Sequence, residues 1–304
     1  MNSSSANGAM AAARMTSAAM SEQSSGQTDA PEQRSAAEKS PSDLLPRILS
    51  GIVMIGAALT ALYLGGSVWT IAIGLCAIAM CFEWQSMVHG GQKNYAIAAL
   101  LSAATLACFV VGLFFGLFYG VGLALGLAAT LLLFWLLQPG SDWGWMAFGV
   151  CYIAIPSLAM IWLRDQIEPN GLLLISFLFV VVWATDIGAY TFGRLIGGPK
   201  IFPSISPKKT WAGSIGGLAS AAGLACLLKP GFDLEGSYAA IAIAALALSM
   251  VSQLGDALES ALKRGFGVKD SGTLIPGHGG VLDRLDSLLV CAPVLAAIIW
   301  VSTV

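Results

Sequence analysis

Nine long apolar runs, separated by short polar or Gly/Pro-containing breaks, occupy most of the sequence after residue 43. A transmembrane helix needs about 20 predominantly apolar residues to cross the hydrocarbon core of a bilayer. We therefore expect an all-α, polytopic integral membrane protein with about nine transmembrane helices. The expected spans run roughly over Ile48–Leu64, Ser67–Phe82, Tyr95–Phe115, Leu117–Leu137, Trp145–Leu163, Gly171–Phe192, Trp211–Leu228, Tyr238–Leu254 and Leu285–Val301.

The composition agrees with this class of protein. Hydrophobic residues make up 57% of the chain and charged residues only 11%, whereas charged residues form about a quarter of a typical soluble domain. A net charge of −2 and the lack of a basic run give no reason to expect a nucleic-acid partner. The six cysteines lie inside apolar runs without a CxxC pair, so we interpret them as small hydrophobic core residues.

The first 43 residues differ sharply from the rest of the chain. They are rich in Ser, Ala, Gln and Glu and contain no aromatic residue, which predicts a disordered cytosolic tail ahead of a membrane-embedded domain over residues 44–304. Cytoplasmic connections are enriched in Lys and Arg. With the amino terminus in the cytoplasm, 13 of the 15 Lys and Arg residues fall on that side, and only Arg164 and Lys229 fall outside. Nine spans then put the carboxyl terminus outside.

Asp186 lies deep in the sixth apolar run, within VVVWATDIGAYTFGRLIGG. An ionisable side chain inside a membrane span is costly and usually marks a functional site. The alternative is an ion pair between Asp186 and Arg194 that only joins two helices. Sequence alone leaves both interpretations open.

A lysine pair precedes the seventh span, in SISPKKTWAG. Lys208 and Lys209, with the hydroxyl groups of Ser206 and Thr210, can donate to a phosphate chain. The start of a helix adds free N–H groups and the positive end of the helix dipole. The alternative is that the lysines only anchor the topology of the span.

The eighth span leads into SQLGDALESALKRGFGVKD, where Asp256, Glu259 and Lys263 are spaced i, i+3, i+7. On a continuing helix they share one face. Two acids and a lysine on one face suit a cation bridged to a phosphorylated ligand. An ordinary solvated face with an i, i+4 pair is the alternative.

The next segment, SGTLIPGHGGVLDRLDS, combines glycines with a histidine and closely spaced acids. Gly279 and Gly280 let the backbone approach an anion, and His278 lies beside them. Asp283 and Asp286 are one helical turn apart. Mg²⁺ commonly binds one or two carboxylates together with water and substrate phosphates, so this segment predicts a magnesium site.

Several familiar motifs are missing from the sequence. It contains no GxxxxGK[ST], HExxH or GxSxG motif and no GxGxxG after a strand, which argues against soluble kinases and hydrolases. We also find no internal repeat and no matched pair of broken helices, which disfavours a secondary transporter without excluding one.

The polar segments together resemble the signature of the phosphatidate cytidylyltransferases, also called CDP-diacylglycerol synthases. The segments LPRILSGIV, FEWQSM, DIGAYTFGRLIGG and SPKKTWAG occur in the order of that family, and Ala212 stands where the family pattern has a glutamate. The segment SALKRGFGVKDSGTLIPGHGGVLDRLD, residues 260–286, matches the main signature of the family almost completely. The matching residues are Ser260, Lys263, Arg264, Lys269, Asp270, Pro276, His278, Gly279, Gly280, Asp283, Arg284 and Asp286.

This resemblance implies that CTP and phosphatidic acid react to CDP-diacylglycerol and pyrophosphate with Mg²⁺. The implied metal ligands are Asp256 and Asp283, with Asp286 as a third acid. Asp186 either binds a second cation or orients Lys208. The groups implied to neutralise phosphates are Lys208, Lys209, Lys263, Arg264 and Lys269. The groups implied to hold a phosphate, the cytidine or other parts of the substrates are Ser206, Thr210, His278, Gly279, Gly280 and Arg284.

The resemblance also implies a bacterial inner-membrane protein whose active site faces the cytoplasm, and it suggests a homodimer formed through membrane helices. Three alternative functions stay open from the sequence. They are a CTP-dependent lipid kinase, a cytidylyltransferase for an isoprenoid or ether-lipid phosphate, and a transporter or channel for an anion.

Overall fold

The computed structural model describes residues 44–303, except residues 168, 233–236 and 276. The predicted disordered tail, residues 1–43, lies outside the described residues and stays a prediction.

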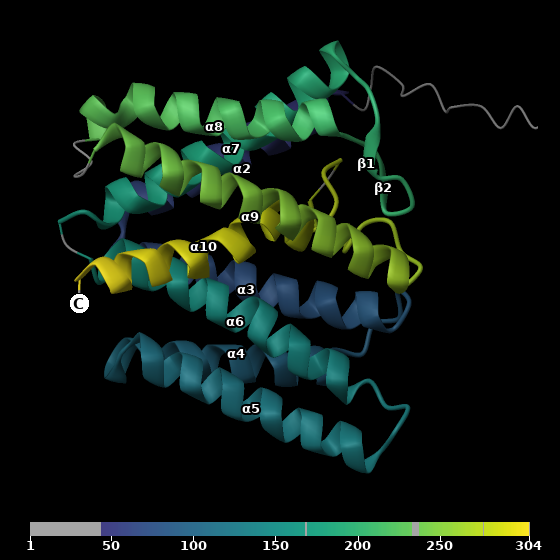
Figure 1. Cartoon of the computed structure of the whole chain (residues 1–304). Helices are drawn as coiled ribbons and strands as arrows, with labels where there is room; N and C mark the ends of the chain where they lie inside the picture. Colours follow the sequence, from purple (N-terminus) through teal and green to yellow (C-terminus); the bar gives the residue numbers. More distant parts are fainter. Residues whose placement is uncertain (1–43, 168, 233–236, 276, 304) are drawn as a thin grey trace, which may run out of the picture. The chain divides into compact units, whose positions relative to one another are not determined.

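Nine α-helices and one antiparallel two-stranded ribbon make up the described part of the chain (Figure 1). The short strands β1 (Lys200–Phe202) and β2 (Ser206–Thr210) lie between two of these helices. The all-α prediction is therefore confirmed, with the ribbon as an addition. The helices are α2 (Leu44–Leu64), α3 (Gly66–Val88), α4 (Tyr95–Phe115), α5 (Leu117–Leu137), α6 (Trp143–Asp165), α7 (Gly171–Leu195), α8 (Trp211–Phe232), α9 (Tyr238–Gly265) and α10 (Leu282–Thr303).

Eight of these helices, α3 to α10, are long and apolar enough to cross a membrane. The first expected span differs, because the apolar stretch Ile48–Leu64 of α2 is shorter than the others. The prediction of about nine spans thus corresponds to eight long helices and one shorter apolar helix. The cytoplasmic amino terminus and the outer carboxyl terminus stay predictions.

Helix α9 extends well beyond the apolar run that predicted it, and several other helices extend by a few residues. We expected a span ending near Leu254, but α9 continues to Gly265, and α10 begins at Leu282 rather than Leu285. A helix is held by its own backbone hydrogen bonds, so an apolar run marks where a helix can cross a bilayer and not where it ends. The extension places Asp256, Glu259 and Lys263 on one continuous helix, as their spacing predicted.

Helix α6 is the most enclosed of the candidate spans. In its most apolar window 78% of the residues are buried, compared with 17% for α5, and α6 packs against α3, α4, α5, α7 and α10. Phe148 and Tyr152 of α6 lie against the fully buried Trp84 of α3, with ring centroids 5.5 Å and 5.7 Å apart. Trp84 also donates to the carbonyl oxygen of Trp145 at 3.0 Å. These contacts fix the end of α3 close to the functional site described below.

Helices α7 and α8 approach each other through small residues. A Cβ atom on Gly217 would lie 2.9 Å from the carbonyl oxygen of Thr185, and one on Gly213 would lie 2.7 Å from that of Ala189. Small residues allow such close backbone packing between membrane helices. The α7–α8 pair therefore forms a tightly packed wall.

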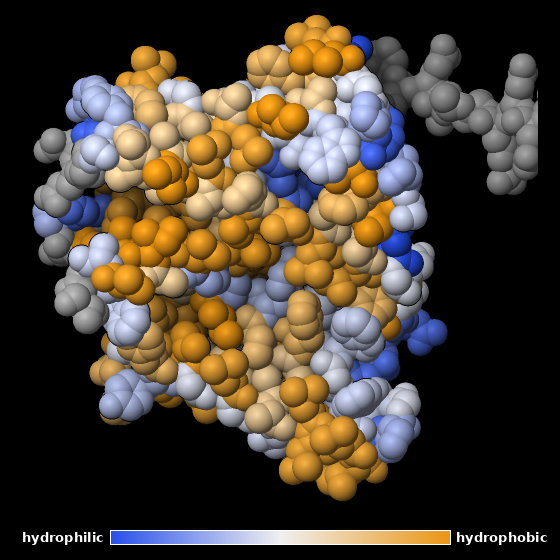
Figure 2. Space-filling model, in the orientation of Figure 1, coloured by the Kyte–Doolittle hydropathy of each residue, from blue (hydrophilic) through white to orange (hydrophobic). Residues whose placement is uncertain are grey.

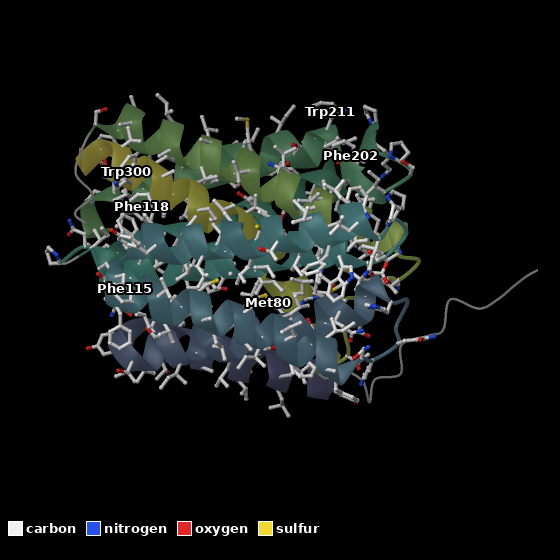
Figure 3. All side chains as sticks on the ribbon, turned by 90° about the horizontal axis from the view of Figure 1, so that it is seen from below. Met80, Phe115, Phe118, Phe202, Trp211 and Trp300 are labelled. Carbon is white, nitrogen blue, oxygen red and sulfur yellow. The ribbon has the colours of Figure 1, made fainter. Side chains whose placement is uncertain are left out.

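The surface has the pattern of a membrane protein. Figure 2 shows hydrophobic residues over the side of the bundle, hydrophilic residues toward its ends, and a hydrophilic hollow that interrupts the apolar side face. Aromatic side chains lie at both ends, with Phe202 and Trp211 at the ribbon end and Phe115, Phe118 and Trp300 at the opposite end (Figure 3). Aromatic residues commonly gather at membrane–water interfaces in this way.

Candidate active site

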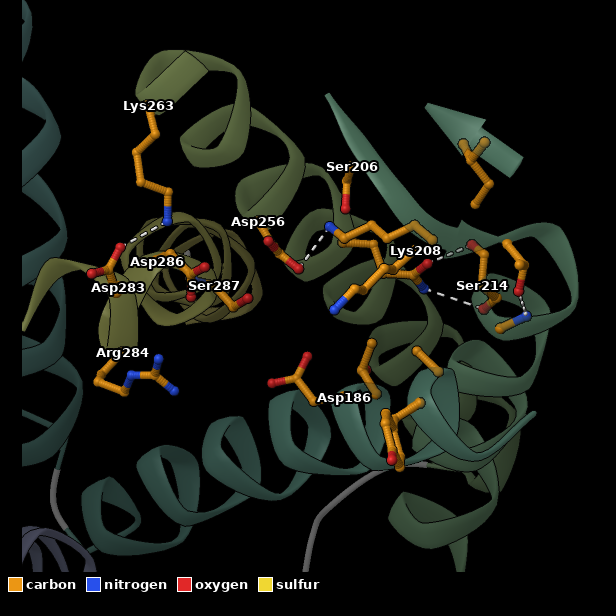
Figure 4. A pocket seen from close by; sticks show the side chains of 18 of the residues that line it. Asp186, Ser206, Lys208, Ser214, Asp256, Lys263, Asp283, Arg284, Asp286 and Ser287 are labelled. Atoms are coloured by element: carbon orange, nitrogen blue, oxygen red, sulfur yellow. Dashed lines mark hydrogen bonds and ion pairs between the residues drawn. The ribbon is translucent and has the colours of Figure 1, made fainter. Parts of the chain in front are cut away.

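A cavity of about 550 Å³ opens at the ribbon end of the bundle, between α7, β2, α8, α9 and α10. This size lies within the range of about 300–1,000 Å³ that is typical of small-molecule sites. Ten of the fifteen residues predicted to form the site line it: Asp186, Ser206, Lys208, Lys209, Thr210, Asp256, Lys263, Asp283, Arg284 and Asp286 (Figure 4). The cavity therefore brings together residues of all four polar segments, which lie between residues 186 and 286 of the sequence.

The cavity is lined by charges of both signs. Five aspartates and four basic side chains surround it, the fifth aspartate being Asp270. Figure 4 shows Asp186 and Arg284 pointing into its open middle from α7 and α10. Arg194 donates to the hydroxyl of Tyr190 at 2.7 Å, and among the ion pairs of the described residues none joins Arg194 to Asp186. The alternative of a helix-joining Asp186–Arg194 pair is therefore wrong for this arrangement.

The strand β2 supplies one side of the cavity. Lys209 forms an ion pair with Asp256 of α9, with 2.6 Å between Nζ and Oδ2, while Lys208 is exposed. The backbone N–H of Gly213 donates to the Thr210 hydroxyl at 3.1 Å, so this threonine lines the cavity and also caps the start of α8. The predicted helix start beside the lysine pair is confirmed, and the lysines themselves lie on the ribbon.

Helices α9 and α10 are joined by a charged cluster. Lys263 lies between Asp283, at 2.7 Å, and the buried Glu259, at 3.3 Å. Asp283 also accepts hydrogen bonds from the backbone N–H groups of Ser271 and Gly280, both at 2.9 Å to Oδ2. Asp283 thus has a structural task at the start of α10 in addition to facing the cavity.

The other five predicted residues do not line the cavity. Arg264 and Lys269 are exposed. His278 forms a hydrogen bond with Ser50 of α2, with 2.9 Å between Nδ1 and Oγ. The prediction that these residues and Gly279 and Gly280 bind substrate stays a prediction.

Gly279 has a positive φ of 89°, which glycine adopts without strain. A Cβ atom on Gly280 would collide with Ser271 and Glu83. Both glycines are therefore required by the shape of the loop, independently of any contact with substrate.

Several residues of the cavity were not predicted. Ser214 and Gln253 hydrogen-bond each other across α8 and α9, and Gln253 also donates to the carbonyl oxygen of Ser214 at 3.3 Å. Gln253 lies three residues before Asp256, so helical spacing was the signal that could have found it. Ser214 carries no such signal, because it reaches the cavity only through the packing of α8.

The carboxylates fit a magnesium ion that is shared with a substrate. Within residues 44–304 as described, no three His, Cys, Asp or Glu side chains come together as a ready ligand set. Mg²⁺ usually keeps water and binds one or two carboxylates plus substrate phosphates. Asp186, Asp256 and Asp286 face one cavity from three helices, which offers that number of ligands without a closed protein cage.

Fold and cavity together define an integral membrane protein with a cavity lined by acidic and basic side chains. The chain belongs to the cytidylyltransferase family, whose family model matches residues 45–302.

Curated relatives agree with this assignment. A phosphatidate cytidylyltransferase of Brucella suis biovar 1 (strain 1330) is 42% identical over 257 residues, which cover 84% of this chain and 92% of the relative. One of Rickettsia bellii (strain RML369-C) is 32% identical over 266 residues, covering 86% and 92%. One of Staphylococcus saprophyticus is 44% identical over 149 residues, covering 49% and 57%.

Proposed function

We propose that this protein is a phosphatidate cytidylyltransferase, which transfers CMP from CTP to phosphatidic acid and yields CDP-diacylglycerol and pyrophosphate in phospholipid synthesis. The observation that carries the proposal is the charged cavity at one end of a bundle of apolar helices, in a chain of the cytidylyltransferase family. A lipid phosphate reaches this place from the bilayer and a nucleotide reaches it from the adjacent aqueous phase.

In the reaction, a phosphate oxygen of phosphatidic acid attacks the α-phosphorus of CTP. A new P–O bond forms, the bond from the α-phosphorus to the bridging oxygen of the β-phosphate breaks, and pyrophosphate leaves with that electron pair. The attacking oxygen is already anionic, so the step needs no dedicated general base. Such transfers depend mainly on positioning and on neutralising charge.

The basic side chains of the cavity supply that neutralisation. Lys208, Lys209 and Arg284 reach the cavity from β2 and α10, and Lys263 lies deeper, beside Asp283. We assign these four residues to the phosphates of the two substrates. Their placement on different elements lets them contact attacking, transferred and leaving groups at once.

The acids Asp256 and Asp286 would hold Mg²⁺, with Asp186 as a further ligand or as the holder of a second cation. The bound metal would withdraw charge from the phosphate oxygens. The ion pair between Lys209 and Asp256 keeps a cation beside this carboxylate until the substrate complex arrives.

We also propose that the protein lies in a bacterial inner membrane with the cavity facing the cytoplasm. The cavity lies at the end of the bundle that carries the connections after α7 and α9, where Lys and Arg are concentrated. Such connections belong on the cytoplasmic side. A homodimer through membrane helices stays a prediction.

The test is a reaction of purified protein in detergent with cytidine-labelled CTP, phosphatidic acid and Mg²⁺. We expect lipid-extractable label and an equimolar amount of pyrophosphate, both abolished by EDTA. Phosphorylated lipid together with CDP would instead indicate a CTP-dependent lipid kinase. Uptake of an anion into proteoliposomes without CTP consumption would indicate a transporter, and either result would overturn the proposal.

A further inference from the structure

A buried carboxylate near the end of α3, Glu83, hydrogen-bonds the segment that leads into α10 without lining the cavity itself. Glu83 is only 7% exposed and is not among the residues that line the cavity. Its Oε1 atom accepts a hydrogen bond from the backbone N–H of Val281 at 2.9 Å. Its Oε2 atom accepts from the backbone N–H of Leu282 at 2.8 Å and from the Ser271 hydroxyl at 3.3 Å. Glu83 therefore ties α3 to two points of the connection between α9 and α10.

The two backbone contacts lie at the start of α10. The first N–H groups of any helix lack partners within the helix, and a negative charge there also interacts favourably with the helix dipole. Capping side chains usually come from the helix's own first residues. Glu83 acts from 199 residues away in the sequence, so the position of α10 depends on α3.

Asp283 holds the same junction from the other side. Its carboxylate accepts from the backbone N–H groups of Ser271 and Gly280 and forms the ion pair with Lys263. Ser271 is thus held at its hydroxyl by Glu83 and at its N–H by Asp283. Glu83 and Asp283 therefore support the start of α10 from two sides.

Two glycines of the connection make room for Glu83. A Cβ atom on Gly272 would lie 2.7 Å from Oε1 of Glu83, and one on Gly280 would lie 2.6 Å from Oε2. Neither glycine has the positive φ that excludes other residues. The requirement for glycine is therefore one of space, around the Glu83 carboxylate at Gly272 and around this carboxylate and the Ser271 hydroxyl at Gly280.

We propose that Glu83 is a positioning residue for the cytidylyl transfer: it fixes the start of α10 and thereby the places of Asp283 and Asp286 at the cavity. This inference rests on the proposed function, because the affected step is the transfer from CTP. Misplacement of a reacting constellation by about 1 Å can cost a hundredfold in rate.

The experiment compares Glu83→Ala, Glu83→Gln, Gly272→Ala and the double variant of Glu83→Ala with Gly272→Ala. Gly272→Ala perturbs the same contact while the acid stays in place, which keeps the test valid if Glu83→Ala folds poorly. Gln85→Ala is the matched control. Gln85 is 1% exposed on the same helix, but it holds the α3–α4 connection by accepting from the Asn94 N–H at 2.9 Å.

Three readouts are taken for each variant: kcat and KM for CTP, the shift of the unfolding temperature that CTP with Mg²⁺ causes in the absence of lipid, and hydrogen exchange of residues 280–283. We expect Glu83→Ala to lower kcat about ten- to hundredfold, to reduce the CTP-induced shift and to speed exchange. Glu83→Gln keeps one acceptor oxygen and is milder. The single variant Gly272→Ala is expected to show the same changes as Glu83→Ala. In the double variant, Gly272→Ala should add little to the effect of Glu83→Ala, because the carboxylate with which the new methyl group collides is absent.

Gln85→Ala is expected to lower the unfolding temperature while kcat and the CTP-induced shift stay near the wild-type values. Equal loss of turnover in Gln85→Ala, or simple addition of the two single effects in the double variant, would overturn the inference. So would wild-type exchange at residues 280–283 in Glu83→Ala. If the wild-type protein itself fails to convert CTP with phosphatidic acid, the proposed function is wrong, and the exchange readout still decides whether Glu83 anchors α10.

Discussion

Replacing Lys263 by methionine tests the charged cluster between α9 and α10. The lysine side chain is 15% exposed, and its partners Glu259 and Asp283 are 1% and 6% exposed. Methionine keeps most of the apolar stem and removes the charge, which leaves two enclosed carboxylates without their cation. Removal of one partner from a buried ion pair typically costs about 3–5 kcal/mol.

This cost predicts a clear change in thermal stability. One kcal/mol corresponds to about 2–4 °C in the unfolding temperature of a domain of 150–250 residues, so we expect Lys263→Met to unfold about 6–20 °C below the wild type in detergent. The exposed Lys93 gives the matched control, and Lys93→Met should change stability by no more than about 0.5 kcal/mol.

A second substitution separates stability from catalysis. Adding Glu259→Gln to Lys263→Met replaces the buried acid that has lost its lysine partner with a neutral side chain, while Asp283 retains its hydrogen bonds from Ser271 and Gly280. We expect the double variant to regain part of the lost unfolding temperature and none of the turnover, because a phosphate-neutralising cation is still missing. An unfolding temperature of Lys263→Met equal to that of the wild type, or a double variant less stable than Lys263→Met, would refute this reasoning.

Three further outcomes are expected. Arg164→Ala should lower stability by about 1–3 kcal/mol without changing CTP turnover, since Arg164 donates to two carbonyl oxygens in the last turn of α2; a loss of turnover at unchanged stability would contradict this. Gly120→Ala should lower the free energy of unfolding by about 1–3 kcal/mol, because the added Cβ would lie 2.8 Å from a backbone oxygen of α4. Gly126→Ala on the same helix is the control, since its Cβ would enter open space. In a thermal unfolding scan this control should match the wild type. Lys208→Ala should raise the KM for CTP about tenfold with a smaller effect on kcat. A larger effect on kcat than on KM would argue against a phosphate contact of Lys208. So would an equal rise of KM in the exposed control Lys200→Ala.

Spacing within one helix was enough to predict which residues would share a face at the cavity. Asp256 and Lys263 lie on one helix, and Asp283 and Asp286 lie on another, so each pair was predictable from its i, i+3 or i, i+7 spacing. Spacing gave less information about positions in the loop before α10. There, His278 bonds Ser50 of α2 and lies outside the cavity lining. A loop residue with polar neighbours in the sequence can face any of several elements, and its spacing does not say which.

The contacts of Glu83 could not be predicted from the sequence either. In the sequence Glu83 directly follows the expected span Ser67–Phe82, within FEWQSM, and nothing in the sequence indicates its partner. Its partners lie 188 to 199 residues away and two of them are backbone N–H groups, which carry no side-chain signature. Only a folded structure can pair such groups.

The sequence by itself determined the membrane class, the number and approximate extent of the helices, and the charged segments whose residues line the cavity. These follow from local properties: the length of apolar runs against the thickness of a bilayer, and the repeat of the helix. The tertiary structure alone decided which charged groups share the cavity, that Asp283 is held by Lys263 and the loop, and that Glu83 supports α10 from a distant helix. Those arrangements depend on how helices pack against one another, and the packing is set by contacts between residues that are far apart along the chain.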